Sequence, residues 1–289
     1  MLTRRDILTW TMTAGVTSAA MPTWPRSALE VAAGLPIVDT NISLFRWPFR
    51  RLPFDTPNLL VQKLRSLGIV QGWAASFEGI LHRDISGVNQ RLAEVCRAWA
   101  ELVPIGSINP AVPGWEKDLH RCISEYNMPG VRLYPSYHGY TLDDPRFVRL
   151  LQHAAQAGRF IQIAVAMEDQ RTQNTLLRVS DVDPGPLIKL MPGIENARVQ
   201  ILNHNLRPDL LQQLGTTPGV FFDTARVEGT DGIPRLVNNV ASERVLFGSH
   251  APFLIPEASL IRVHESDKLD EASLVRVLSD NAALLLAEK

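Results

Sequence analysis

The chain contains few cysteines, no excess charge of either sign and no long hydrophobic run. Only two of its 289 residues are cysteines, Cys96 and Cys122, too few for a disulfide scaffold or a four-thiolate zinc site. Lys and Arg number 29 against 30 Asp and Glu, so the net charge is −1 and we expect no nucleic-acid partner. No segment approaches the roughly 20 apolar residues of a membrane-spanning helix, so we expect no membrane span.

Two sequence motifs that would define other enzyme classes are also missing. Residues 39–45, within and just after the first apolar run, contain no glycine-rich phosphate loop, which argues against a dinucleotide-binding open sheet. No Gly-x-Ser-x-Gly motif occurs, and Gly248-Ser249-His250 lacks the strand-turn-helix context of a nucleophilic serine. Both cysteines fall in predicted helices rather than at strand ends. We therefore expect neither a dinucleotide cofactor nor a serine or cysteine nucleophile.

The first thirty residues have the features of an export signal. Arg4 and Arg5 precede a mildly apolar run, Leu8 to Met21, that is rich in small residues. The adjacent arginines resemble a twin-arginine signal, which predicts that residues 1–30 are removed and that the protein is periplasmic or secreted. The alternative is an amphipathic first helix with two incidental arginines. Residues 35–289 show no linker or internal repeat and are expected to form one domain.

From residue 35 onward, short apolar runs alternate with longer amphipathic segments. Helical spacing of apolar residues occurs in Asp84 to Ala100 and in Asp270 to Leu286, among others. The apolar runs predict parallel strands covered on both faces, and they lie at residues 36–44, 69–77, 102–108, 130–134, 160–166, 198–202, 219–223 and 244–248. Strands and helices alternating in this way over about 250 residues predict a single (β/α)8 TIM barrel. A doubly wound open sheet is the alternative, and residues 167–186 are expected to form a loop over the barrel mouth.

Polar and charged side chains recur where the predicted strands end. In a TIM barrel the active site lies at the carboxyl ends of the strands. Any one of these side chains is equally well explained as a capping or loop residue, but their recurrence at all eight ends predicts a site for a small-molecule substrate. The candidate site residues are Asn41, Arg46, Glu78, Arg132, Tyr134, His138, Tyr140, Glu168, Arg171, His204, Asp223, Arg226 and His250.

Four segments of the chain resemble the amidohydrolase-related family of metal-dependent hydrolases. These are Pro36 to Leu44, Gly130 to Leu133, Arg244 to Phe253 and the C-terminal Ser279 to Leu285. They occur in the family's order and on the corresponding strands, and the similarity covers roughly residues 35–286. The resemblance implies a TIM barrel of the amidohydrolase superfamily, in which imidazoles and carboxylates bind a divalent metal at the mouth.

This chain departs from the family pattern at most of the metal-binding positions. The family's first-strand Asp-x-His-x-His corresponds to Asp39-x-Asn41-x-Ser43, so that both imidazoles are missing. His250 stands where the family has an Asp, and only His204 matches an expected His. Because amides and hydroxyls are poor zinc ligands, we expect no metal at the usual positions and no other cofactor. A zinc-like divalent metal at a rebuilt site made of His204 and His250 remains the alternative.

The resemblance also suggests chemistry that needs no metal. Some members of the family, lactonases of aromatic-acid breakdown, hydrolyse a cyclic ester without one, with arginines on the substrate carboxylates and an eighth-strand side chain activating water. By analogy, neutral His250 is the expected general base, with a pKa suited to neutral pH. Glu168 or Asp223 is expected to orient His250 or His204. The predicted function is therefore a metal-independent hydrolase of a small carboxylated or cyclic substrate, such as a lactone or amide.

The remaining candidates receive substrate-binding roles. Arginine binds carboxylates bidentately, and Arg132, Arg171 or Arg226 is expected to do so. Oxyanion donors are expected among Tyr134, Tyr140 and Asn41.

Two other functions are compatible with the same residues. One is a catalytically inactive barrel that binds a ligand or a partner, with the aromatic segments Trp47 to Arg51 and Tyr134 to Tyr140 lining its pocket. The other is a decarboxylase with the rebuilt metal site. An apolar barrel exterior is also compatible with a homodimer.

Overall fold

The apolar runs of the sequence form parallel strands in the computed structural model, which describes residues 35–265 and 267–287. The segment predicted as an export signal, residues 1–30, lies outside these described residues. Ile105 divides the third predicted strand into β3 and β4. The strands are β1 (Ile37–Leu44), β2 (Ile69–Ser76), β3 (Leu102–Pro104), β4 (Gly106–Ser107), β5 (Gly130–Leu133), β6 (Phe160–Ala164), β7 (Val199–Leu202), β8 (Val220–Asp223) and β9 (Val245–Leu246).

Helices begin where the sequence offers capping groups. The side chain of Asp84 accepts a hydrogen bond from Gly87 N at the start of α3, and the side chain of Asp144 accepts one from Arg146 N at the start of α6. The helices are α2 (Pro57–Ser66), α3 (Ile85–Cys96), α4 (Trp115–Ser124), α5 (Pro135–His138), α6 (Pro145–Gln156), α7 (Leu187–Leu190), α8 (Pro208–Thr216), α9 (Gly232–Val240), α10 (Pro256–His264), α11 (Glu271–Val275) and α12 (Asn281–Leu286). A π-helical turn, Arg276–Asp280, joins α11 to α12. Within the described ranges, no helix has the length and apolar character needed to cross a membrane.

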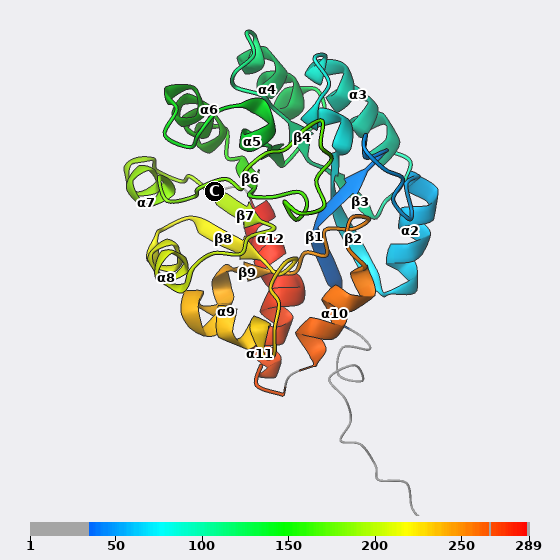
Figure 1. The fold of residues 1–289 in the computed structure, drawn as a ribbon, viewed down its shortest axis with the longest axis vertical. Helices are drawn as coiled ribbons and strands as arrows, with labels where there is room; N and C mark the ends of the chain where they lie inside the picture. Colours follow the sequence, from blue (N-terminus) through cyan, green and yellow to red (C-terminus); the bar gives the residue numbers. More distant parts are fainter. Residues whose placement is uncertain (1–34, 266, 288–289) are drawn as a thin grey trace, which may run out of the picture.

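The strands form two hydrogen-bonded parallel sheets, β1-β2-β3 and β4-β5-β6-β7-β8-β9, which are linked at both edges. At one edge, Ile105 N donates to Ala74 O (2.8 Å). At the other, Thr40 N donates to Phe247 O and Ser43 N donates to Ala251 O, each at 2.9 Å. Figure 1 shows the helices arranged around the outside of this ring of strands. The predicted (β/α)8 barrel is confirmed, and the open-sheet alternative is not.

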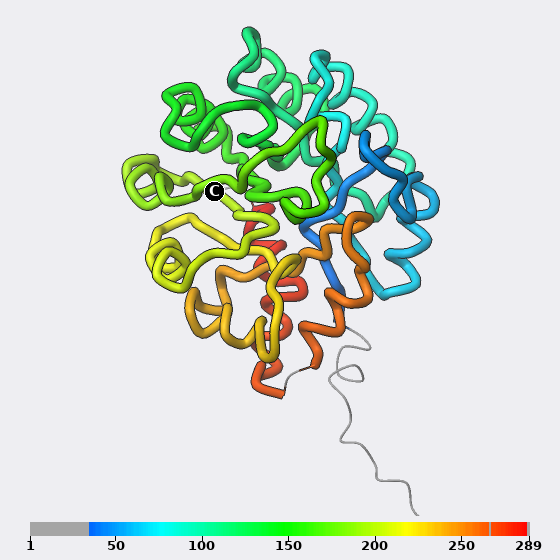
Figure 2. Tube along the Cα trace, viewed as in Figure 1, coloured from blue at the N-terminus to red at the C-terminus, as the bar shows by residue number. Residues whose placement is uncertain are grey.

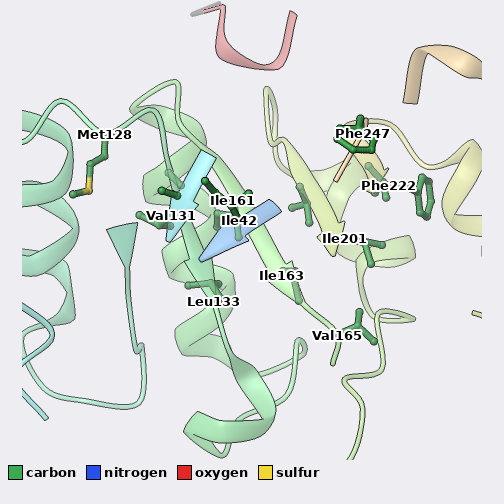
Figure 3. Close-up of a cluster of buried hydrophobic side chains, with 14 of the residues drawn as sticks. Ile42, Met128, Val131, Leu133, Ile161, Ile163, Val165, Ile201, Phe222 and Phe247 are labelled. Atoms are coloured by element: carbon green, nitrogen blue, oxygen red, sulfur yellow. The ribbon is translucent and has the colours of Figure 1, made fainter. Parts of the chain in front are cut away.

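Side chains alternate between the two faces of the central strands. Figure 3 shows outward-facing members of the core between strands and helices, including Val131, Ile161 and Ile201. The residue after Val131 and the residue after Ile161 are Arg132 and Gln162, which face the barrel interior, as expected from the two-residue period of a strand. The apolar runs therefore contain a polar layer that lies inside the barrel.

The C-terminal helix packs against one end of the barrel interior. Ala282 and Leu285 of α12 lie in one buried cluster with Trp73 and Phe160, whose rings stack with centroids 5.0 Å apart. The guanidinium of Arg198 fixes this helix by donating to Leu285 O (2.8 Å) and Ala287 O (2.7 Å). Because the apolar cluster fills this end, any site open to small molecules is expected at the other end, where the strands finish.

A glycine before β8 gives a first testable prediction about the ring. Gly219 has φ +72°, and a Cβ built on it would lie 2.1 Å from Ala197 O. Gly114 has φ +85° with nothing within 4 Å of its Cβ position. We expect Gly114→Ala to lower the free energy of unfolding by about 1–2 kcal/mol, the cost of a left-handed backbone. Gly219→Ala should cost clearly more, since its methyl would also displace the carbonyl of Ala197, two residues before β7. Urea unfolding of both variants checks this, and equal losses would contradict it.

Candidate active site

Three side chains, one from the middle of β1 and two from the ends of β7 and β8, form a buried hydrogen-bonded group that we call the Asn–Asp cluster: Asn41, Asn203 and Asp223. Asn41 Nδ2 donates to Asn203 Oδ1 (2.8 Å) and to Asp223 Oδ2 (2.7 Å). Asn203 N donates to Asp223 Oδ1 (2.9 Å). Asn203 adopts a left-handed backbone, φ +56°, which asparagine tolerates better than most residues. The cluster joins strands from opposite ends of the sequence at the barrel mouth.

Two carboxyl groups at this mouth have unusual acidities. Burial raises the pKa of Asp223 to about 7, against the opposing effects of hydrogen bonds from Asn41 and Asn203 and of the Arg132 charge. Burial likewise raises the pKa of Asp39 to about 6, although Asp39 Oδ1 accepts hydrogen bonds from Ser249 N (2.9 Å) and Asn41 N (3.1 Å). A carboxyl that titrates near neutral pH suits general acid–base catalysis. Asp223 is therefore the better placed of the two for that role.

Three buried acceptor atoms at the mouth have no hydrogen-bond partner among the residues that the structure describes. They are Asp39 Oδ2, Asn41 Oδ1 and His250 Nδ1. Buried polar atoms without partners are uncommon in native proteins because each costs free energy. Their concentration around the Asn–Asp cluster indicates a place that binds a hydrogen-bond donor.

The two candidate histidines are held by backbone carbonyls. His250 Nε2 lies 2.8 Å from Met167 O and His204 Nε2 lies 3.1 Å from Asp223 O. Burial lowers the pKa of His250 to about 3 and that of His204 to about 4. Both rings are thus neutral with Nε2 protonated, which leaves the lone pair on Nδ1. The near-neutral pKa expected for His250 is therefore wrong. Burial lowers this pKa, and the positive charges of Arg132 and Arg226 lower it further.

Neither carboxylate orients an imidazole as the sequence analysis expected. Glu168 pairs with Arg50 at 2.5 Å, and the Asp223 carboxyl is bonded to the Asn–Asp cluster. The carbonyl of Asp223, rather than its carboxyl, holds His204. Backbone carbonyls, and not carboxylates, therefore orient both histidines.

Arg132 lies inside the barrel rather than at its rim and is only 1% exposed. Its guanidinium donates to Gln162 Oε1 (2.9 Å) and to Ile42 O (3.0 Å), with longer bonds to Thr40 O and Trp73 O (both 3.4 Å). This differs from the expected carboxylate clamp. The side chain connects β5 and β6 to β1 and β2 from within.

The other predicted site residues are spread around the mouth, away from the Asn–Asp cluster. His138 Nε2 lies 3.1 Å from Gly79 O, and its ring contacts those of Tyr134 and Tyr140. Glu78 pairs with Arg91 of α3 at 2.8 Å. The Arg171 side chain is 88% exposed and pairs with Asp169, and Arg46 is exposed. The structure brings together Asn41, Asp223 and His204 but not these, and His250 is held separately by Met167 O.

An aromatic cover lies over the mouth, formed by Trp47, Phe49, Phe77, Tyr137 and Phe253. The Trp47 ring makes edge contacts with the other four rings, with centroids 5.1–6.3 Å apart. The Arg50 guanidinium lies 4.8 Å from the centre of the Phe253 ring while pairing with Glu168. The loop after β6, residues 167–186, crosses the ring of strands beside it, as the tube in Figure 2 shows. The rings thus pack on one another, and the two aromatic segments also line cavities, one of about 220 Å³ beside Trp47 to Arg51 and a separate one of about 640 Å³ beside Tyr140.

A ring of parallel strands surrounded by helices, with polar side chains at the strand ends, defines the class of TIM-barrel folds. The chain belongs to the amidohydrolase family: the sequence profile described as Amidohydrolase matches residues 38–287. A search of curated proteins gives no significant match.

Solved structures of similar fold include aromatic-acid decarboxylases. The 5-carboxyvanillate decarboxylase LigW from Sphingomonas paucimobilis has a TM-score of 0.68 at 12% identity, with 89% of this chain and 100% of that chain covered. The Novosphingobium aromaticivorans enzyme of the same name, complexed with manganese and a nitrobenzoic acid, has 0.67 at 11%, covering 88% and 96%. The 2,6-dihydroxybenzoate decarboxylase from Rhizobium has 0.63 at 12%, covering 86% and 98%. At these identities the likeness is one of fold.

The side chains at the mouth do not fit the divalent metal that the family resemblance implies. In residues 35–265 and 267–287, no group of three or more His, Cys, Asp and Glu side chains is arranged to hold a metal ion. Asn41 and Ser43 replace the two first-strand imidazoles, and Ser43 Oγ accepts from Arg132 Nη1 (3.3 Å). A cationic guanidinium thus stands beside one ligand position. In the alternative rebuilt site, His204 and His250 each bond a backbone carbonyl through Nε2, which leaves Nδ1 as the ring nitrogen that could bind a metal.

Proposed function

We propose that this member of the amidohydrolase family is a metal-independent enzyme that uses Asp223 as general acid and base on a small carboxylated substrate. The observation that carries the proposal is the Asn–Asp cluster: a buried carboxyl with a pKa of about 7 stands at the strand ends, held by Asn41 and Asn203. Acid–base groups work best when their pKa lies near the working pH.

The reaction we favour is hydrolysis of a cyclic ester or amide. Asp223, as carboxylate, takes a proton from water while the water oxygen forms a bond to the substrate carbonyl carbon. The ring C–O or C–N bond then breaks, and the protonated Asp223 returns the proton to the leaving atom. His250 Nδ1, a buried acceptor to which no described residue donates, accepts a hydrogen bond from the attacking water. The neutral state of His250 keeps this lone pair available.

A second candidate reaction is decarboxylation of a hydroxybenzoate. It is favoured by the fold shared with 2,6-dihydroxybenzoate and 5-carboxyvanillate decarboxylases. In this case protonated Asp223 would donate its proton to the ring carbon as the C–C bond to the carboxylate breaks and CO2 leaves.

One screen separates these reactions and tests the independence from metal. Protein treated with EDTA is compared with the same protein supplied with manganese, on dihydrocoumarin, phthalide, 2,6-dihydroxybenzoate and 5-carboxyvanillate. We expect ring opening of a lactone at equal rates in both preparations. Release of CO2 would establish the second candidate, and activity that appears only with manganese would refute the metal-independent mechanism. Turnover of none of them would favour the ligand-binding barrel.

A further inference from the structure

A cavity of about 350 Å³ opens between α8 and α9, beside the Asn–Asp cluster. Small-molecule sites typically have volumes of roughly 300–1,000 Å³, so it is large enough for a compact ligand. It is bordered by His204 at the end of β7 and by Arg226 beyond β8. His204 is bonded to the backbone carbonyl of Asp223, so the cavity is one side chain away from β8.

The cavity carries positive charge on an apolar body. Arg226 and Arg235 line it, and Glu228 is the single carboxylate among its described lining residues. Neither arginine forms an ion pair within the described chain. Apolar side chains complete the walls: Leu206, Leu211, Val227 and Leu236. Two guanidinium groups beside an apolar surface are suited to a carboxylate attached to a ring or short hydrocarbon.

His204 adds an acceptor to this cavity. The residue is only 4% exposed, and its Nε2–H donates to Asp223 O. Nδ1, which carries the lone pair of the neutral ring, has no hydrogen-bond partner in the described parts of the chain. An acceptor at a cavity wall is satisfied by a hydroxyl and not by a carboxylate. The cavity thus combines the guanidinium groups of Arg226 and Arg235 with a hydrogen-bond acceptor on His204.

We propose that this cavity binds a small hydroxycarboxylic acid, with Arg226 and Arg235 on the carboxylate and His204 Nδ1 accepting from the hydroxyl. The inference deepens the proposed function, on which it rests for the identity of this ligand as substrate or product. Arg226 is the connection between the two, since its charge acts on the buried His250 of the mouth. Arg235 and Asn239 come from helix α9 and not from a strand end.

Calorimetric titration of the full-length protein tests the inference without any turnover. The probes are 3-hydroxybenzoate, its uncharged amide 3-hydroxybenzamide, benzoate without the hydroxyl, and inorganic phosphate. We expect the amide to bind at least about 10-fold more weakly than 3-hydroxybenzoate, since a hydrogen bond to a charged group is worth about 1.5–3 kcal/mol. Benzoate should bind about 3- to 10-fold more weakly. Phosphate binding as tight as that of 3-hydroxybenzoate would refute a carboxylate site.

A pair of arginine variants locates the binding. Arg235 is exposed on α9, so Arg235→Met should fold normally and weaken 3-hydroxybenzoate at least about 10-fold. The matched control is Arg207→Met, whose side chain is 82% exposed next to α8 and does not line the cavity. Equal affinities of both variants and wild type, or no binding of 3-hydroxybenzoate by wild type, would overturn the inference. Binding that obeys this pattern in a protein without turnover would leave the cavity assigned and the proposed function refuted.

Discussion

Replacing Arg132 by methionine is expected to lower the free energy of unfolding by about 3–5 kcal/mol, because several buried acceptors would lose their donor at once. Methionine fills a similar volume but donates no hydrogen bond. The acceptors of the guanidinium, among them Ile42 O and Gln162 Oε1, would stay buried inside the barrel. Each unsatisfied buried acceptor costs about 1–3 kcal/mol. Thr40 O would keep one donor in the variant, because Gln162 Nε2 also donates to it (2.8 Å).

Urea unfolding, with midpoint and slope both fitted, measures this loss. Arg171→Met is the matched control: its side chain is 88% exposed, and we expect a change below about 0.5 kcal/mol. Arg132→Lys should lose an intermediate amount because an ammonium cannot reproduce the planar fork of donors. If Arg132→Met and Arg171→Met proved equally stable, the interior network would carry no net stabilisation.

The fold could be predicted because strands and helices leave different periods in the sequence. The run around Ile161 and Ile163 predicts β6, and the helical spacing after Asp84 predicts α3 with its cap. What an apolar run does not reveal is the polar layer within it. Gln162 and Gln200 interrupt their runs singly, at the two-residue period that sends them into the barrel, where Gln162 Nε2 donates to Gln200 Oε1 (2.8 Å). These single polar residues within apolar runs are the sequence signal from which the polar layer could have been predicted.

The rule that active sites lie at strand ends located part of the site and misplaced the rest. Asn41 and Asp223 do meet at the mouth. Arg132 also stands near a strand end, yet the direction of its side chain carries it inward, and sequence position alone does not give that direction. Asn203 received no role, although it follows a predicted strand directly. Arg235 could not be found by this rule, since it comes from a helix.

The pKa values of the site residues could not be predicted from the sequence, for another reason. They depend on burial under loops and rings that are far apart in the chain. Met167 O meets His250 Nε2, and the Phe253 ring stacks on the His250 ring with centroids 5.1 Å apart. These contacts exclude water and favour the neutral imidazole. No local pattern around His250 encodes them.

Replacing Asp223 by asparagine is expected to reduce kcat/KM at least about 100-fold once a substrate is identified, because general acid–base catalysis contributes roughly 10²–10⁴-fold. In the wild type, kcat/KM for hydrolysis should fall as the pH drops below about 7, where Asp223 becomes protonated. The residual activity of the variant should lack this step. Asp209→Asn on α8, outside the Asn–Asp cluster, is the control and should keep wild-type kinetics. Full activity of Asp223→Asn would remove Asp223 from the mechanism.

The same variant should respond to pH in its stability with the opposite sign. The pKa of Asp223 is raised from 3.8 to about 7 by folding, so its contribution to stability is complete below pH 3.8 and is lost as the pH rises through 7. Asparagine does not titrate. The Tm of Asp223→Asn relative to wild type should therefore be higher at pH 8 than at pH 5, since each pKa unit corresponds to about 1.4 kcal/mol. A Tm difference that stays constant between these pH values would show that Asp223 is not strained by burial. A loss of activity together with a relative gain in alkaline stability would identify a carboxyl kept at the mouth for chemistry at the expense of folding.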